Sequence, residues 1–123
     1  MMKFDMPRHL EIWQWSVSYA KRIYTITNSF PKSELYGLVS QLRRAAVSIS
    51  ANIAEGSGSN SKRDKLNYLD IAIKSALETT SEIQIAYELQ FIDESTRNEL
   101  YKEAEIIIRK IRSFKKFLTN HTP

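Results

Sequence analysis

The chain has 123 residues, of which 42% are hydrophobic and 26% are charged, and its formal net charge is +4. This length predicts one domain, residues 1–123, with a core of its own, and the mild charge permits an anionic partner without requiring one. Because the sequence contains no cysteine, no signal-peptide pattern and no apolar run of membrane-spanning length, we exclude disulfides, thiolate sites and membrane insertion and expect a cytoplasmic protein.

Four helices are predicted from apolar residues that recur every three or four positions. The first ends before Pro31, which disfavours helix at the preceding residue. The second has Ser33 as its expected N-cap and Gly56 where a C-cap glycine is common. A flexible linker follows, and Ser61 begins a capping motif for the third helix. The predicted helices cover residues 8–28, 34–55, 62–90 and 94–118. Their short connections predict an all-α, up-down-up-down antiparallel four-helix bundle.

The first predicted helix carries two apolar stripes. We expect one of them to face the core: Leu10, Trp13, Val17, Ala20 and Tyr24. The other lies roughly opposite: Ile12, Trp15, Tyr19, Ile23, Ile26 and Phe30. Because a bundle helix needs only one apolar face, the second stripe is predicted to be an oligomer interface covered by another copy of the chain. The alternative is that some of its members lean over neighbouring helices while Phe30 closes the end of the bundle.

A polar stripe follows one side of the second predicted helix, beside its core stripe. Its members are Gln41, Arg44, Ser48, Asn52 and Glu55. Such a set can be a reaction centre, a nucleic-acid contact or a device that fits helices together. Buried polar groups are costly unless they are paired, and paired groups fix the register of a helix contact. We therefore interpret the stripe as a structural polar seam between helices or subunits. Arg43 falls on a different face, where it can meet solvent or a ligand.

No catalytic or metal-binding constellation is evident in the sequence. The two histidines, His9 and His121, lie near the ends, and no Glu-x-x-His motif supplies the ligands of a di-metal bundle. The GSGS stretch lacks the lysine and the preceding strand of a phosphate loop. Glu78 and Glu82 lie one helical turn apart, for which we expect a solvated pair or a salt bridge to arginine. We therefore expect neither catalysis nor a cofactor or metal ion.

Basic residues gather at two places on the predicted surface. One group begins the third helix, where cations are unfavourable for the helix dipole and a role outside the fold is favoured. The other shares the outer face of the fourth helix, interrupted by Glu105. We expect the candidates for nucleic-acid binding to point away from their own core: Arg43, Lys62, Arg63, Arg109, Arg112 and Lys116. Each group alone is typical of a solvated surface, but repetition around an oligomer would add phosphate contacts.

A set of short segments in the second and third predicted helices forms a pattern that is typical of one protein family. It comprises QLRRA at 41–45, SI at 48–49, NIAEG at 52–56, IA at 71–72 and residues 75–78. These segments resemble the four-helix-bundle proteins encoded in intervening sequences of bacterial 23S ribosomal RNA genes. More distantly, they resemble the accessory variability determinant of diversity-generating retroelements. The resemblance implies a ring-like homopentamer that binds nucleic acid. The chain departs from the pattern at Ser50, where the family often has proline, and at Lys74, where it often has glycine.

Two classes of function follow from these patterns. The first is a non-enzymatic homo-oligomeric bundle that binds nucleic acid, either RNA or DNA with RNA favoured, through backbone electrostatics. The alternative is a structural adaptor ring that recruits a protein partner without nucleic acid. No base-reading motif is present, so the sequence does not identify a natural ligand.

Overall fold

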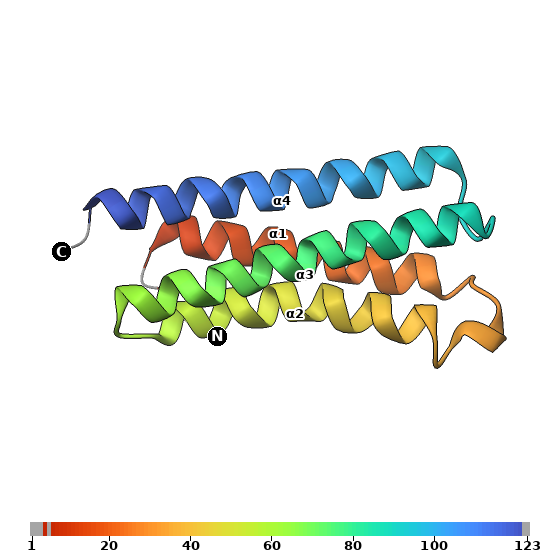
Figure 1. Ribbon diagram of the computed structural model, residues 1–123, viewed down its shortest axis with the longest axis horizontal. Helices are drawn as coiled ribbons and strands as arrows, with labels where there is room; N and C mark the ends of the chain where they lie inside the picture. Colours follow the sequence, from red (N-terminus) through yellow and green to blue (C-terminus); the bar gives the residue numbers. More distant parts are fainter. Residues whose placement is uncertain (1–3, 5, 122–123) are drawn as a thin grey trace.

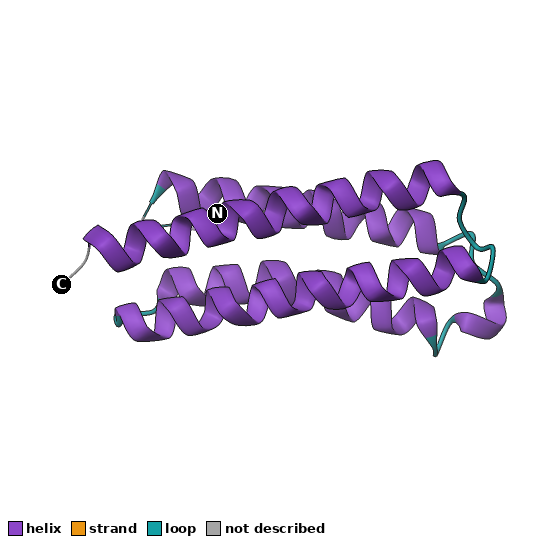
Figure 2. Ribbon diagram, turned by 45° about the horizontal axis from the view of Figure 1, so that its top comes forward, coloured by secondary structure: helices purple, strands orange, loops and turns teal. Residues whose placement is uncertain are grey.

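The computed structural model describes residues 4 and 6–121, and within that part of the chain it is all-helical. The elements are α1 (Pro7–Thr27), the short 3-10 helix η1 (Lys32–Glu34), α2 (Leu38–Gly58), α3 (Lys62–Glu88) and α4 (Glu94–His121). Figure 1 shows the four long helices side by side, with the chain reversing direction from each helix to the next. Only short loops join them (Figure 2). The predicted all-α four-helix bundle is confirmed. None of the described helices is both long enough and apolar enough to cross a membrane.

Each helix packs against the next in sequence, and α4 returns to α1. The core is built from aliphatic side chains that recur on one face of each helix and are buried between the helices. Its members with the least exposure include Ile23, Leu42, Ile49, Ile53, Leu69, Ile83, Leu100, Ile107 and Ile111. Complete burial of a side chain of this size contributes about 1.5–3 kcal/mol. The apolar side chains buried between the four helices are therefore the main source of stability.

The burial of the two apolar stripes on α1 differs from the prediction. The stripe that was expected to meet another copy lies in the chain's own core, with Ile12, Tyr19, Ile23 and Phe30 at 7% exposure or less. Its remaining members, Trp15 and Ile26, are half-buried against the same core. In the stripe that was expected to face the core, Ala20 is buried and Trp13 packs partly against the core, but Leu10, Val17 and Tyr24 are 37%, 40% and 43% exposed. The assignment of the four buried residues to an oligomer interface is therefore wrong, whereas for the half-buried Trp15 and Ile26 it stays a prediction.

The polar residues on the buried side of α1 explain this error. His9, Ser16 and Thr27 are buried there and dilute the apolar pattern. Each has a backbone acceptor: His9 Nε2 lies 2.7 Å from the carbonyl oxygen of Ile53, and the Ser16 hydroxyl donates to Trp13 O at 2.7 Å. The Thr27 hydroxyl donates to Ile23 O at 2.7 Å. Pairing of this kind removes most of the cost of burying a polar group, so these residues are compatible with the core.

The ends of α2 also differ from the prediction. Ser33 lies in η1, and the carboxylate of Glu34 accepts the N–H of Leu38 at 3.3 Å at the true start of the helix. Gly56 is buried within α2, and no described glycine has a positive φ. A Cβ on Gly56 would lie 3.3 Å from the Cβ of Tyr68 on α3. The glycine therefore permits close approach of α3 and does not form the predicted C-cap.

The contact between α1 and α4 is the least extensive in the bundle and is bridged by ion pairs. Arg22 on α1 pairs with both Glu99 and Glu103 on α4. Lys110 Nζ lies 2.6 Å from the Glu11 carboxylate. All of these side chains are partly or largely exposed. The bundle therefore closes on itself through surface electrostatics as well as apolar packing.

Candidate nucleic-acid interface

A line of cationic side chains follows the outer face of α4. The core residues of this helix lie on the opposite face, which directs Lys102, Arg109, Arg112 and Lys116 into solvent. From Lys102 to Lys116 the line is about 21 Å long at 1.5 Å per residue. Arg109 forms an ion pair with Glu105 one turn earlier. Arg112 and Lys116 form no ion pair or hydrogen bond with the residues that the structure describes. Three predicted candidates are thus brought together.

A further cation, Lys74, is added to this line by α3. Lys115 pairs with Asp70 across the α3–α4 contact, and this pair shows which levels of the two helices lie side by side. Lys74 lies one turn beyond Asp70, and Arg112 lies about one turn before Lys115, so the two cations stand at the same level. Lys74 is exposed. Helix periodicity could place Lys74 on the surface but could not place it beside α4, because the register between helices depends on tertiary packing.

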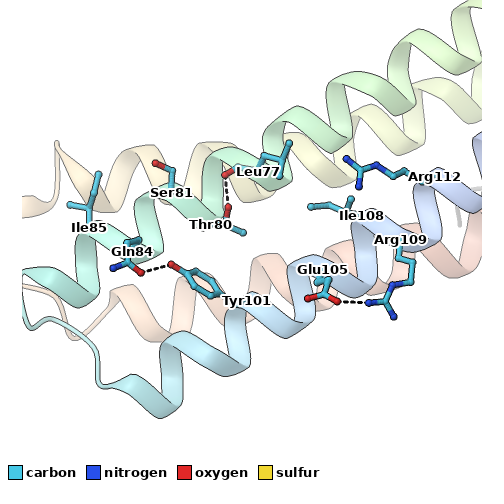
Figure 3. A pocket seen from close by; sticks show the side chains of 10 residues that line it. All are labelled: Leu77, Thr80, Ser81, Gln84, Ile85, Tyr101, Glu105, Ile108, Arg109 and Arg112. Atoms are coloured by element: carbon cyan, nitrogen blue, oxygen red, sulfur yellow. Dashed lines mark hydrogen bonds and ion pairs between the residues drawn. The ribbon is translucent and has the colours of Figure 1, made fainter.

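A groove of about 900 Å³ runs between α3 and α4 beside the cationic line (Figure 3). Its apolar residues are Leu77, Ile85, Tyr101 and Ile108, and its polar residues are Thr80, Ser81, Gln84, Glu105, Arg109 and Arg112. Figure 3 shows Arg112 extending from α4 towards α3, whereas Arg109 bends towards Glu105. The Tyr101 hydroxyl donates to Gln84 Oε1 at 2.5 Å and ties the two walls together. The groove thus combines an apolar floor with one cationic end.

Of the remaining basic candidates, Arg43 and Lys62 are less exposed than predicted. Arg43 is half-buried, donates to Thr27 Oγ1 and Asn28 Oδ1 at 3.0 Å, and lies 4.5 Å above the ring of Tyr24. Its guanidinium is therefore held against the end of α1, and the prediction that it points away from the fold is wrong.

The two candidates at the start of α3 differ from each other. Lys62 is half-buried, whereas Arg63 is exposed. Arg63 lies two turns before Asp70, so it extends the cationic line towards the end of the bundle where α4 terminates.

The predicted polar seam on α2 is structural at two of its five positions. The hydroxyls of Ser48 and Ser75 lie 2.9 Å apart across the α2–α3 contact. Asn52 Nδ2 donates to Ser48 O at 2.8 Å and to Ser48 Oγ at 3.0 Å. Both seam residues are half-buried, but Gln41, Arg44 and Glu55 are exposed. For these three the expected burial between helices of the chain is wrong, and a contact with another subunit stays a prediction.

The carboxyl group of Glu82 is an unexpected feature of the interior. The sequence predicted that it would be solvated or bridged to arginine, but it is only 7% exposed and its Oε1 has no hydrogen-bond partner in the described chain. Burial, with a smaller contribution from the charge of Glu78, raises the pKa of Glu82 to about 7. Among residues 4 and 6–121, no group of three or more acidic or histidine side chains could hold a metal ion.

The hydroxyl of Tyr19 is another buried polar group, and it is satisfied. It lies 2.9 Å from Thr79 Oγ1, which donates its own proton to Ala76 O at 2.6 Å. Thr79 therefore accepts from Tyr19, and the pair links α1 to α3 inside the core.

Comparisons with known proteins agree with this architecture. A family model described as 23S rRNA-intervening sequence protein matches residues 8–113. Among solved structures, the chain is similar to a protein with unknown function from the S23 ribosomal protein family from Bacteroides thetaiotaomicron, with a TM-score of 0.81 and 24% identity. That match covers 89% of this chain and 98% of the other, and at such identity it supports the fold alone. No curated protein matches the chain.

Proposed function

Since this chain belongs to the 23S rRNA-intervening sequence protein family, we propose that it is a non-enzymatic, homo-oligomeric bundle that binds RNA through the phosphate backbone. The cationic line on α4 carries this proposal, because Arg112 and Lys116 are exposed and unpaired within the described chain. Lys74 and Arg63 extend the same surface from α3. The name of the family, which associates it with ribosomal RNA, gives independent support.

We propose self-association because the cations of a single chain are too few for tight binding to RNA. A protein needs several phosphate contacts for appreciable affinity at physiological salt, and each contact adds about 0.7–0.9 to the slope of log affinity against log salt. One chain offers only a few such contacts, whereas an oligomer repeats them. The resemblance described above sets the expected number of copies at five.

The surface proposed for self-association lies where α1 meets α2. It contains Leu10, Val17 and Tyr24 on α1 and Val47 on α2, each 37–43% exposed. Arg43 joins the two helices at this surface by stacking on Tyr24. Exposed apolar side chains gathered in this way are typical of a protein contact surface. A second copy that covers these side chains would remove their apolar surface from water, which is favourable.

Light scattering is expected to give a mass well above the 14.3 kDa of one chain, and Val17→Glu is expected to lower that mass. The introduced carboxylate would be buried without a partner in the contact, which is unfavourable. Ser18→Glu is the matched control, since Ser18 is also exposed but lies a quarter-turn away on α1. Circular dichroism should show that both variants keep their helices. A parent protein that is monomeric at micromolar concentration would contradict self-association.

The triple variant Arg109→Gln, Arg112→Gln, Lys116→Gln is expected to bind RNA at least tenfold more weakly at low salt. The slope of log affinity against log salt should fall by about 2–3, which corresponds to three lost phosphate contacts. Fluorescence anisotropy with a labelled structured RNA provides the measurement. Lys21→Gln, Lys32→Gln is the control, because it removes two charges from exposed positions on α1 and η1, away from α3 and α4. If the triple variant bound RNA as tightly as the parent, the cationic line on α4 would not contact RNA and would be an ordinary solvated face. No binding by the parent at low salt would instead favour the adaptor ring.

A further inference from the structure

We propose that the groove between α3 and α4 holds unpaired bases, so that the protein binds single-stranded RNA in preference to duplex RNA. This inference rests on the proposed RNA-binding function and names the form of RNA that the same surface recognises. It requires three properties of the groove: an apolar floor for the faces of the bases, polar groups for their edges, and cations for the phosphates that connect them.

The floor of the groove is apolar and accessible. Leu77 and Ile85 on α3 are 48% and 47% exposed, and Ile108 on α4 lies deeper at 7%. The ring of Tyr101 forms part of the same wall and is half-buried. Such surfaces favour contact with the flat faces of nucleobases, which stack on aromatic and apolar side chains with little regard to sequence.

The walls of the groove carry unused hydrogen-bonding groups. Gln84 accepts the Tyr101 hydroxyl with Oε1, so its amide nitrogen keeps two donors for another partner. The hydroxyl of Ser81, one turn from Leu77, forms no hydrogen bond with the described residues. Both groups line the groove (Figure 3) and can meet the polar edge of a base that lies on the apolar floor. The hydroxyl of Thr80 is already used, since it donates to Leu77 O at 2.7 Å.

The charges favour a polyanion over a peptide with a single acidic group. Arg112 extends over one end of the groove (Figure 3), and Lys74 stands at its level on α3. Beyond the groove the cations continue along α4 to Lys116. An acidic peptide seated in the groove would use only the cations at its end. A nucleic-acid strand can place bases in the groove while its phosphates follow the line.

The groove also discriminates between forms of RNA. In a duplex the faces of the bases are stacked on one another, and proteins contact mainly the phosphates and 2′-hydroxyls. Unpaired bases are free to leave the stack and enter the groove. Duplex RNA therefore gains only the electrostatic part of the interaction, whereas a single strand gains both parts.

The decisive experiment compares a groove variant, Leu77→Ala with Ile85→Ala, against a control, Ile71→Ala with Leu89→Ala. All four residues are on or directly after α3 and are 42–51% exposed, but only the first two line the groove. The probe is a labelled adenine oligoribonucleotide, used alone and annealed to its uracil complement, with anisotropy measured over a range of salt. The parent should bind the single strand about tenfold more tightly than the duplex. The groove variant should lose about tenfold for the single strand only, with its salt slope unchanged, because apolar contacts release no counterions. The control should match the parent.

A second variant, Ser81→Leu, narrows the groove with a bulkier side chain that has no ring and removes a hydroxyl proposed to meet the base edge, and it should reproduce the same loss. Thermal melting by circular dichroism checks that every variant is folded. Equal affinity of the parent for single strand and duplex would overturn the inference and leave the electrostatic function intact. So would single-strand binding that neither variant weakens. A parent that binds neither probe at low salt would remove both proposals, and capture of an acidic amphipathic peptide would then assign the groove to a protein partner.

Discussion

Replacing Ile23 by glutamate is expected to unfold the protein. Ile23 is 1% exposed on the core side of α1. Its removal costs about 2–5 kcal/mol in lost burial and packing, and a carboxyl group in the same place adds several kcal/mol because no partner is available. Domains of this size have a total free energy of unfolding of about 5–15 kcal/mol. Circular dichroism should therefore show loss of helix, or a melting temperature lowered by tens of degrees.

Val17→Glu is the control on the same helix. Val17 is 40% exposed, so the introduced carboxylate stays in water within each chain. The expected change in the free energy of unfolding of the isolated chain is below about 1 kcal/mol. If Val17→Glu unfolded the protein while Ile23→Glu did not, the original prediction would be correct, with the Val17 side of α1 facing the core.

Glu82→Gln is expected to stabilise the protein above pH 7 and to remove most of a decline in stability between about pH 4.5 and 7. The folded state holds the proton of Glu82 up to about pH 7, whereas the unfolded chain releases it near the ordinary pKa of a glutamate. The folded state thus binds more protons in this window, and the free energy of unfolding must fall as the pH rises. A neutral amide has no such charge to bury. The expected gain at pH 8 is roughly 2–3 kcal/mol, since one pKa unit corresponds to about 1.4 kcal/mol.

Urea unfolding of the parent and the variant at pH 5 and pH 8 measures this effect. Glu78→Gln serves as the control, because Glu78 is exposed and contributes less than burial does to the raised pKa of Glu82. It should relieve only a small part of the decline. A parent whose stability is the same at both pH values would show that the Glu82 carboxyl is solvated in the native state.

The sequence predicted most of the fold because three of the four helices have one dominant apolar stripe. In α2, apolar residues recur every three or four positions from Leu38 to Ile53 and are buried, whereas Leu35 continues the same spacing but lies before the helix and is 46% exposed. In α1, two stripes of similar size compete, and periodicity alone cannot choose between them. The choice is made by tertiary contacts, such as that between Tyr19 and Thr79 on α3, which no local pattern contains.

The candidate site was predictable to the extent that it lies on a single helix. Arg109, Arg112 and Lys116 are opposite the core stripe of α4, so their exposure follows from the helical wheel. The direction of the Arg43 side chain could not be predicted, because its partners are at the end of α1. Lys74 and the groove were missed because they depend on the register between α3 and α4. The signal for the groove was present in Leu77 and Ile85, two apolar residues outside the core stripe of α3.

The ion pairs between α1 and α4 mean that added salt acts on the bundle as well as on the proposed complex with RNA. Arg22 and Lys110 are on the surface, and exposed pairs of this kind contribute about 0.2–1 kcal/mol each before screening. Release of RNA is far steeper, since 6–10 phosphate contacts lose a factor of about 10³–10⁵ in affinity between low and moderate salt. Salt is therefore expected to weaken the α1–α4 contact only slightly over the range in which it would release RNA from the proposed oligomer. Dissociation of that proposed complex would report the return of counterions to the nucleic acid, while the helices stay folded.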